Sequence, residues 1–225
     1  MIKKKKKKIV WLLIILVIVA GGVLYLFNLP KTNGKKNMLE ETLKNEEKKP
    51  RVALIIAFRG FQDQEYAGTK DSLEKNHIEV VIASSSIGEA EGKYGERVKI
   101  EKTIEEINVN DFEAIVFIGG PGAQEYVDNK TVHKIAQEAV KEEKILAAIC
   151  IAPEILAKAG VLIDKKATVW SSSIDLEPIQ ILEENKAIYS EEDVVIDGKI
   201  ITANGPMAAK KFGEKIVETL ISQMK

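Results

Sequence analysis

One cysteine stands where a short apolar run changes into helical spacing, and its surroundings suit a reactive thiol. Cys150 is the only cysteine of the chain, and it follows the apolar run Ile145 to Ile149. Such a run is typical of a strand covered on both faces in a parallel sheet. Pro153 then suits the first turn of a helix, where a missing N–H costs nothing. The pattern predicts a strand, a tight turn that carries the thiol, and a helix.

Small residues flank the cysteine as a nucleophile elbow requires. Ala148 and Ala152 lie two positions to either side of Cys150, where bulkier side chains would collide with the backbone of such a turn. The start of the following helix adds positive potential, which favours thiolate and predicts a lowered thiol pKa. The competing interpretation is a small buried hydrophobe, because free cysteine is among the most buried residue types.

Strands and helices are expected to alternate along the rest of the domain. Buried strands are predicted at residues 52–58, 79–84, 114–118 and 145–149, and helices at 63–76, with Asp63 as N-cap, and at 129–142. Residues 85–96 read as a polar loop, 97–100 and 167–170 as short strands, 176–184 as a helix, 193–196 with 199–203 as a hairpin, and 205 onward as the last helix. This order predicts an α/β fold, a doubly wound, mostly parallel sheet with helices on both faces.

Three loops should meet at one edge of this sheet, because ligands collect beyond the carboxyl ends of parallel strands. They are residues 61–65, the Gly-Gly-Pro-Gly segment 119–122, and the turn at Cys150. The amides of Gly120 and Ile151 could together stabilise an oxyanion on a carbon attacked by sulfur. The alternatives are an ordinary strand-to-helix turn at 119–122 and, for Glu65, a solvated glutamate in a first helical turn.

The N-terminal segment has the composition of a membrane anchor. Six lysines at residues 3–8 precede an apolar run at 9–29, and about 20 apolar residues cross the roughly 30 Å of bilayer hydrocarbon. We expect an uncleaved transmembrane signal anchor, with the lysines cytoplasmic and the C-terminal domain outside the cell membrane. Residues 30–50 read as a polar linker, and residues 51–225 as the folded domain.

Charge separates the two parts of the chain. Residues 1–50 hold 12 Lys and 4 Glu, which leaves 21 basic and 30 acidic residues, a net charge of −9, in residues 51–225. An acidic domain is a poor partner for nucleic acid or for anionic lipid. We therefore expect no nucleic-acid binding and contact with the membrane only through residues 9–29.

Four ordered segments resemble the ThiJ/PfpI family, which includes the parkinsonism-associated protein deglycase and the PfpI-type proteases. They are Phe61 to Glu65, Gly119 to Ala123, Ala148 to Pro153 and Ile201 to Pro206. The resemblance implies the flavodoxin-like sandwich of class I glutamine amidotransferases, a homodimer, a small carbonyl or peptide-like substrate, a link to stress response, and neither cofactor nor metal. It also implies that Cys150 is the nucleophile, that Glu65 is the carboxyl group that tunes it, and that Gly120 and Ile151 supply the oxyanion amides.

The chain departs from the family at the histidines. PfpI-type proteases carry a histidine where this chain has Ile151, and deglycase and glyoxalase-like members carry one near the position of Trp170. The only histidines, His77 and His133, read as surface or boundary residues. Positioned acids and bases contribute roughly 10² to 10⁴ in rate, so we expect negligible peptidase activity.

Three functions remain open from the sequence. The first is a cysteine-dependent enzyme, a hydrolase, deglycase or glyoxalase-like protein acting on small reactive carbonyls. The second is a non-enzymatic redox-sensing or binding module, in which the Cys150 thiol is oxidised. The third, a degenerate scaffold at the membrane, fits poorly with the intact elbow and the Gly-Gly segment.

Overall fold

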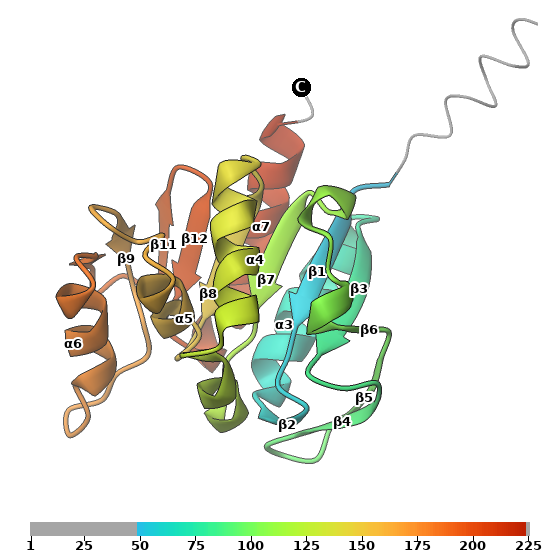
Figure 1. Ribbon diagram of the computed structural model, residues 1–225, viewed down its shortest axis with the longest axis horizontal. Helices are drawn as coiled ribbons and strands as arrows, with labels where there is room; N and C mark the ends of the chain where they lie inside the picture. The colour runs from blue at the N-terminus through green and yellow to red at the C-terminus, as the bar shows by residue number, and fades with distance from the viewer. Residues whose placement is uncertain (1–48, 224–225) are drawn as a thin grey trace, which may run out of the picture. The chain divides into compact units, whose positions relative to one another are not determined.

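A seven-stranded sheet forms the centre of residues 49–223, the part of the chain that this computed structural model describes (Figure 1). Its strands are β1 (Arg51–Ile55), β3 (Glu79–Ser84), β6 (Lys102–Thr103), β7 (Ala114–Phe117), β8 (Ile145–Ile149), β11 (Val194–Asp197) and β12 (Ile200–Ala203). They lie in the order β11-β12-β8-β7-β1-β3-β6. All neighbours pair in parallel except β11 with β12. The predicted α/β architecture with a mostly parallel sheet is confirmed.

Helices cover both faces of the sheet. They are α3 (Asp63–Lys75), α4 (Lys130–Lys141), α5 (Pro153–Lys158), α6 (Glu177–Glu184) and α7 (Ala209–Gln223), with single-turn or short 3₁₀ segments at Ile104–Glu106, Val109–Asp111, Pro121–Tyr126 and Pro206–Ala208. Right-handed crossovers put α3 and α4 on opposite faces, since β1 to β3 and β7 to β8 step in opposite directions along the sheet. In Figure 1, α4 lies in front of the sheet and α7 behind it.

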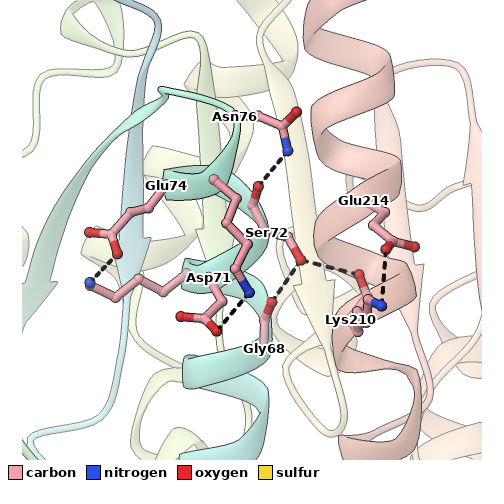
Figure 2. Close-up of polar contacts among 9 residues, drawn as sticks. Gly68, Asp71, Ser72, Glu74, Asn76, Lys210 and Glu214 are labelled. Carbon is pink, nitrogen blue, oxygen red and sulfur yellow. Dashed lines mark hydrogen bonds and ion pairs between the residues drawn. The ribbon is translucent and has the colours of Figure 1, made fainter.

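Small residues let α3 and α7 approach closely on their shared face (Figure 2). The Ser72 hydroxyl donates to the Gly68 carbonyl at 2.9 Å and lies 3.4 Å from the carbonyl of Lys210 on α7. A Cβ added at Gly213 would lie 2.6 Å from the Ser72 Cβ. Phe212, Ile216 and Leu220, spaced along one face of α7, are buried, and Met224 lies outside the described residues.

Two small sheets extend the main one. They are β2 (Arg59–Phe61) with β4 (Gly88–Gly92) and β5 (Arg97–Ile100), and β9 (Lys166–Ala167) with β10 (Ile188–Tyr189). The prediction of a polar loop over 85–96 missed β4, whose composition is weakly strand-like but whose backbone pairs with both β2 and β5. The strand expected at 167–170 is shorter, because only Lys166 and Ala167 pair with β10.

Strand register brings the carboxyl ends of β1, β7 and β8 to one edge. Ile55 pairs with Phe117, and Phe117 with Ala148. All five residues of β8 are fully buried, as the apolar run predicted. The next residues along these three strands are therefore brought together, and they include Gly119 and Cys150.

Among residues 49–223, no helix is both long and apolar enough to cross a bilayer. The predicted anchor at residues 9–29 and all but the last two residues of the predicted linker at 30–50 lie outside the described residues. The transmembrane helix therefore stays a prediction.

Candidate active site

Cys150 lies on a sharp turn between β8 and α5. Its φ of 65° falls in the left-handed region, which costs a non-glycine residue about 1 to 3 kcal/mol and is often found at functional sites. Two backbone bonds fix the turn, from Cys150 N to the Ala203 carbonyl and from Trp170 N to the Cys150 carbonyl, both at 2.9 Å. Ala148 and Ala152 are fully buried beside it. Cys150 thus lies on a tight strand-to-helix turn, and its role as a nucleophile stays a prediction.

Glu65 projects from the first turn of α3 into the same place. Its side chain has no exposed surface, so the alternative of a solvated glutamate is wrong. One carboxyl oxygen, Oε2, accepts a hydrogen bond from the Gly119 amide at 3.1 Å. The other, Oε1, has no nitrogen or oxygen partner among the described residues, and the Cys150 thiol is the side chain with which this carboxyl interacts.

Gly119 makes the meeting of these two side chains possible. A Cβ added there would lie 2.5 Å from the Cys150 Cβ and 2.9 Å from Glu65 Oε2. Any side chain at this position would therefore displace the thiol or the carboxyl group. The first glycine of the Gly-Gly-Pro-Gly segment therefore allows the backbone to lie close to both the thiol and the carboxyl group.

Burial sets the protonation of the pair. Loss of solvation raises the pKa of Glu65 to about 8, and this outweighs the hydrogen bonds from Cys150 and Gly119 and the field of Lys93, which lower it. Burial also raises the pKa of the Cys150 thiol, and the Glu65 carboxylate raises it further. This is opposite to the lowering expected from the helix start. The reason is that the sulfur is largely withdrawn from water and lies beside the Glu65 carboxyl group.

The amides of Gly120 and Ile151 both point at the sulfur and lower the thiol pKa. The Gly120 backbone has a φ of 101°, and an added Cβ would collide with the Gln62 amide. The structure therefore brings together all four residues singled out in the sequence, Cys150, Glu65, Gly120 and Ile151. Two N–H donors beside a sulfur are also suitably placed for an oxygen on a carbon bonded to it.

A pocket of about 240 Å³ opens over the thiol. Its lining is mostly apolar and consists of Gln62, Lys93, Gly120, Pro121, Cys150, Ile151, Trp170 and Pro206. Sequence reasoning did not predict Gln62, Lys93 or Pro206 as lining residues. The only available signal was for Gln62 and Pro206, which belong to the two motif segments 61–65 and 201–206. Lys93 comes from the turn after β4, the strand that the sequence did not reveal.

Neither histidine reaches this pocket. His77 follows the C-cap of α3 with a φ of 59°. It lies just before the amino end of β3, whereas the site lies at the carboxyl ends of the strands. His133 is buried rather than at the surface, and its Nε2 lies 2.7 Å from the Val127 carbonyl oxygen. The two positions where the family would place a histidine, Ile151 and Trp170, both line the pocket. Residues 49–223 contain no group of three or more His, Cys, Asp or Glu that could hold a metal ion.

Comparison with known proteins identifies the family to which this chain belongs. The model of the DJ-1/PfpI family matches residues 50–219. The chain belongs to the DJ-1/PfpI family. It is 36% identical over 185 residues to an uncharacterized protein of Methanocaldococcus jannaschii, which covers 82% of this chain and 87% of that protein.

Two other members of the DJ-1/PfpI family bear on the function and the fold. The protein named Deglycase PfpI from Pyrococcus furiosus is 32% identical over 154 residues, 68% of this chain and 89% of the relative. The crystal structure of a ThiJ/PfpI domain protein from Brachyspira murdochii superposes with a TM-score of 0.74 at 30% identity. That match covers 77% of this chain and 98% of the other. The family resemblance read from four motifs is thereby confirmed.

Proposed function

We propose that this chain is a cysteine-dependent enzyme of the deglycase type that acts on small reactive carbonyl compounds. The observation that carries the proposal is the buried pair of Glu65 and Cys150 beneath a small pocket, with the Gly120 and Ile151 amides at the sulfur. The name of the Pyrococcus furiosus relative, a deglycase, supports the same chemistry.

The pair of Glu65 and Cys150 should be most nucleophilic after it has lost one of its two protons. Below about pH 8 the Glu65 carboxyl is neutral, so the repulsion that its charge exerts on a thiolate is absent. Once one proton has left, a single proton is shared between carboxyl and sulfur, and the form with a thiolate and a carboxylic acid is the nucleophilic one. We therefore expect activity to rise with pH towards about 8.

Addition to an aldehyde then balances within the site. The sulfur forms a bond to the carbonyl carbon, and the carbonyl π electrons move to oxygen, which the amides of Gly120 and Ile151 stabilise. Glu65 gives its proton to that oxygen, so the product is a neutral hemithioacetal beside a carboxylate. The carboxylate is then placed to remove the proton from the carbon that bears the sulfur and to deliver it to the oxygen of the neighbouring carbonyl, which gives an enediol. Transfer of the proton from the sulfur-bearing carbon's hydroxyl to the second carbon gives a thioester, and water then breaks the carbon–sulfur bond to release the hydroxy acid and the thiol.

Peptide hydrolysis requires one further catalytic group, a general acid. The leaving amine must be protonated, and the residue that would do this in PfpI-type proteases is replaced by Ile151. Glu65 is already committed to the thiol and cannot readily serve both steps. We therefore propose that peptides are poor substrates and that small dicarbonyls are turned over slowly.

The test compares wild type, Cys150→Ala and Ile151→His on methylglyoxal and on a peptide. We expect slow methylglyoxal turnover that Cys150→Ala abolishes, no peptidase activity in wild type, and a thermal unfolding midpoint shared by all three. Robust wild-type peptidase activity that is lost in Cys150→Ala would contradict the proposal.

The second candidate is a redox-sensing or binding module that uses the same thiol. It is favoured by Ile151 and Trp170, two side chains without acid or base function at the positions of the family histidines. In that case mild peroxide would oxidise Cys150 in the full-length chain, while no dicarbonyl would be consumed.

We further propose that residues 9–29 hold the protein in the cell membrane with residues 51–225 on the extracytoplasmic side. The support is the lysine run followed by about 20 apolar residues, the length that crosses a bilayer.

A further inference from the structure

A single cationic side chain lines the pocket above Cys150. The walls are mostly apolar, with Ile151, Trp170 and two prolines, and the charged group among the lining residues is Lys93. At about 240 Å³ the pocket is smaller than the roughly 300 to 1,000 Å³ typical of drug-sized ligands. It therefore suits a compact molecule with an apolar body and an anionic end.

The turn that carries Lys93 is held in place by the helix that carries Glu65. The Lys93 amide donates to the Phe61 carbonyl at 2.8 Å. The amides of Tyr94 and Glu96 donate to the two carboxylate oxygens of Asp63 at 3.0 and 2.9 Å. Asp63 is thus the first residue of α3 rather than its N-cap, a position taken by Gln62, and its carboxylate fixes the turn instead.

The charge of Lys93 is available to a ligand. Among residues 49–223, no carboxylate lies within ion-pair distance of its ammonium group. Its field reaches the bottom of the pocket, where it is the cation that lowers the pKa of Glu65. The ammonium lies 5.3 Å from the centroid of the Tyr94 ring, a cation–π contact that leaves its charge unneutralised. It therefore places a positive charge at the pocket of a domain with a net charge of −9.

We propose that Lys93 forms a carboxylate subsite beside Cys150, so that the preferred substrates are α-oxoaldehydes that also carry a carboxylate. The substrate class rests on the proposed function, whereas the subsite itself does not require turnover. The aldehyde carbon would lie at the sulfur and the carboxylate at the Lys93 ammonium, with the apolar walls around the carbon chain.

Charged and neutral alkylating agents test the subsite directly on the full-length chain. Iodoacetate transfers a carboxymethyl group to the sulfur and iodoacetamide a carbamoylmethyl group, each with loss of iodide, so the two reagents differ in carrying a carboxylate or a neutral amide. The measured quantity is the ratio of the two rate constants at Cys150, because changes in thiol nucleophilicity affect both reagents and cancel. Lys93→Met should lower the iodoacetate preference about two- to fivefold, the range for an exposed charge pair.

Two further variants sharpen this comparison. Lys93→Arg keeps the charge and should keep the preference, and Lys99→Met is the matched control, an exposed lysine on β5 of the same small sheet that does not line the pocket. Added salt should reduce the preference of wild type. An equal ratio in Lys93→Met and Lys99→Met would overturn the proposal.

Turnover separates the subsite from the proposed function. Wild type should favour 4,5-dioxopentanoate over methylglyoxal in kcat/KM, and Lys93→Met should lose that advantage through a KM that rises more for 4,5-dioxopentanoate than for methylglyoxal. Failure to consume either compound, with the alkylation preference intact, would overturn the enzymatic function and support the subsite. Consumption of both without any effect of Lys93→Met would overturn the subsite alone.

Discussion

At the scale of single residues, the site is governed by two acidic groups that share a buried space. Glu65 is held neutral at pH 7 by loss of solvation rather than by a like charge, and the Cys150 thiol beside it is also harder to ionise. Two buried acids this close lose their protons as a pair. A carboxylic acid kept in this state can donate to a sulfur or to an oxygen bonded to it, which an ionised glutamate cannot do.

The raised pKa of Glu65 predicts how stability changes with pH. The group is protonated in the folded state up to about pH 8 and ionises near 4.5 when unfolded. Its contribution is therefore fully present below about pH 4.5 and is lost as pH rises through 8. At 1.36 kcal/mol per pKa unit, the loss is on the order of 3 to 5 kcal/mol. Glu65→Gln should weaken this decline in urea unfolding measured from pH 5 to 9.

Glu138→Gln is the matched control, since Glu138 is exposed on α4, and it should leave the pH profile unchanged. Glu154 is also buried, and its pKa is raised to about 7. Because of Glu154, part of the decline in the free energy of unfolding with rising pH should remain in Glu65→Gln. Identical profiles for wild type and Glu65→Gln would mean that this carboxyl group is ionised in the folded protein at neutral pH.

At the scale of elements, close contact between α3 and α7 holds the helix that supplies Glu65. Gly68 and Ser72 on α3 face Ala209 and Gly213 on α7, and Cβ atoms added at the two glycines would lie 3.0 Å from Ala209 and 2.6 Å from Ser72. Backbones this close leave no room for larger side chains. The position of Glu65 thus depends on small residues remote from the pocket.

Gly213→Ala tests this contact, because packing and helix propensity act in opposite directions there. Alanine favours the helix by about 1 kcal/mol over glycine, whereas forcing a methyl group against Ser72 costs about 1 to 3 kcal/mol. We expect a net loss in the free energy of unfolding. Lys211→Ala, at an exposed position of α7, should be nearly neutral. A more stable Gly213→Ala protein would show that the helices move apart at little cost.

At the scale of the whole chain, the charge distribution distinguishes the predicted anchor segment from the folded domain. The first eight residues are basic, whereas the domain has 21 basic and 30 acidic residues. Because positively charged flanks of a membrane span stay on the cytoplasmic side, this distribution predicts that the two parts lie on opposite sides of the membrane.

This arrangement predicts the outcome of proteolysis on whole cells. Protease added to spheroplasts should digest the protein after Lys31, while an epitope tag at the N-terminus remains protected. A cytoplasmic protein serves as the control for intact membranes. Recovery of the full-length protein in the soluble cytosolic fraction would contradict the predicted topology.

The homodimer implied by the family also stays a prediction at this scale. An isologous pair is the commonest symmetry of soluble oligomers, so the full-length chain in detergent should give a dimeric protein mass by light scattering. A monomeric protein mass at tens of micromolar would reject it.

The sequence by itself determined the features that depend on local pattern. Apolar runs marked the buried strands β1, β3, β7 and β8, because a strand covered on both faces must be apolar throughout. Small residues around Cys150 marked the elbow, since the turn excludes bulk. The meeting of Cys150, Glu65 and the Gly-Gly segment also followed, because carboxyl ends of parallel strands share one edge.

Only the tertiary structure decided what these residues experience. The bond between Glu65 and the Gly119 amide spans 54 positions, and the resulting burial raises both pKa values where the helix start alone predicted a lower thiol pKa. Lys93 reaches the pocket through β4, a strand that exists because its backbone pairs with β2 and β5. Desolvation and long-range pairing depend on neighbours that the folded chain supplies, and local spacing does not encode them.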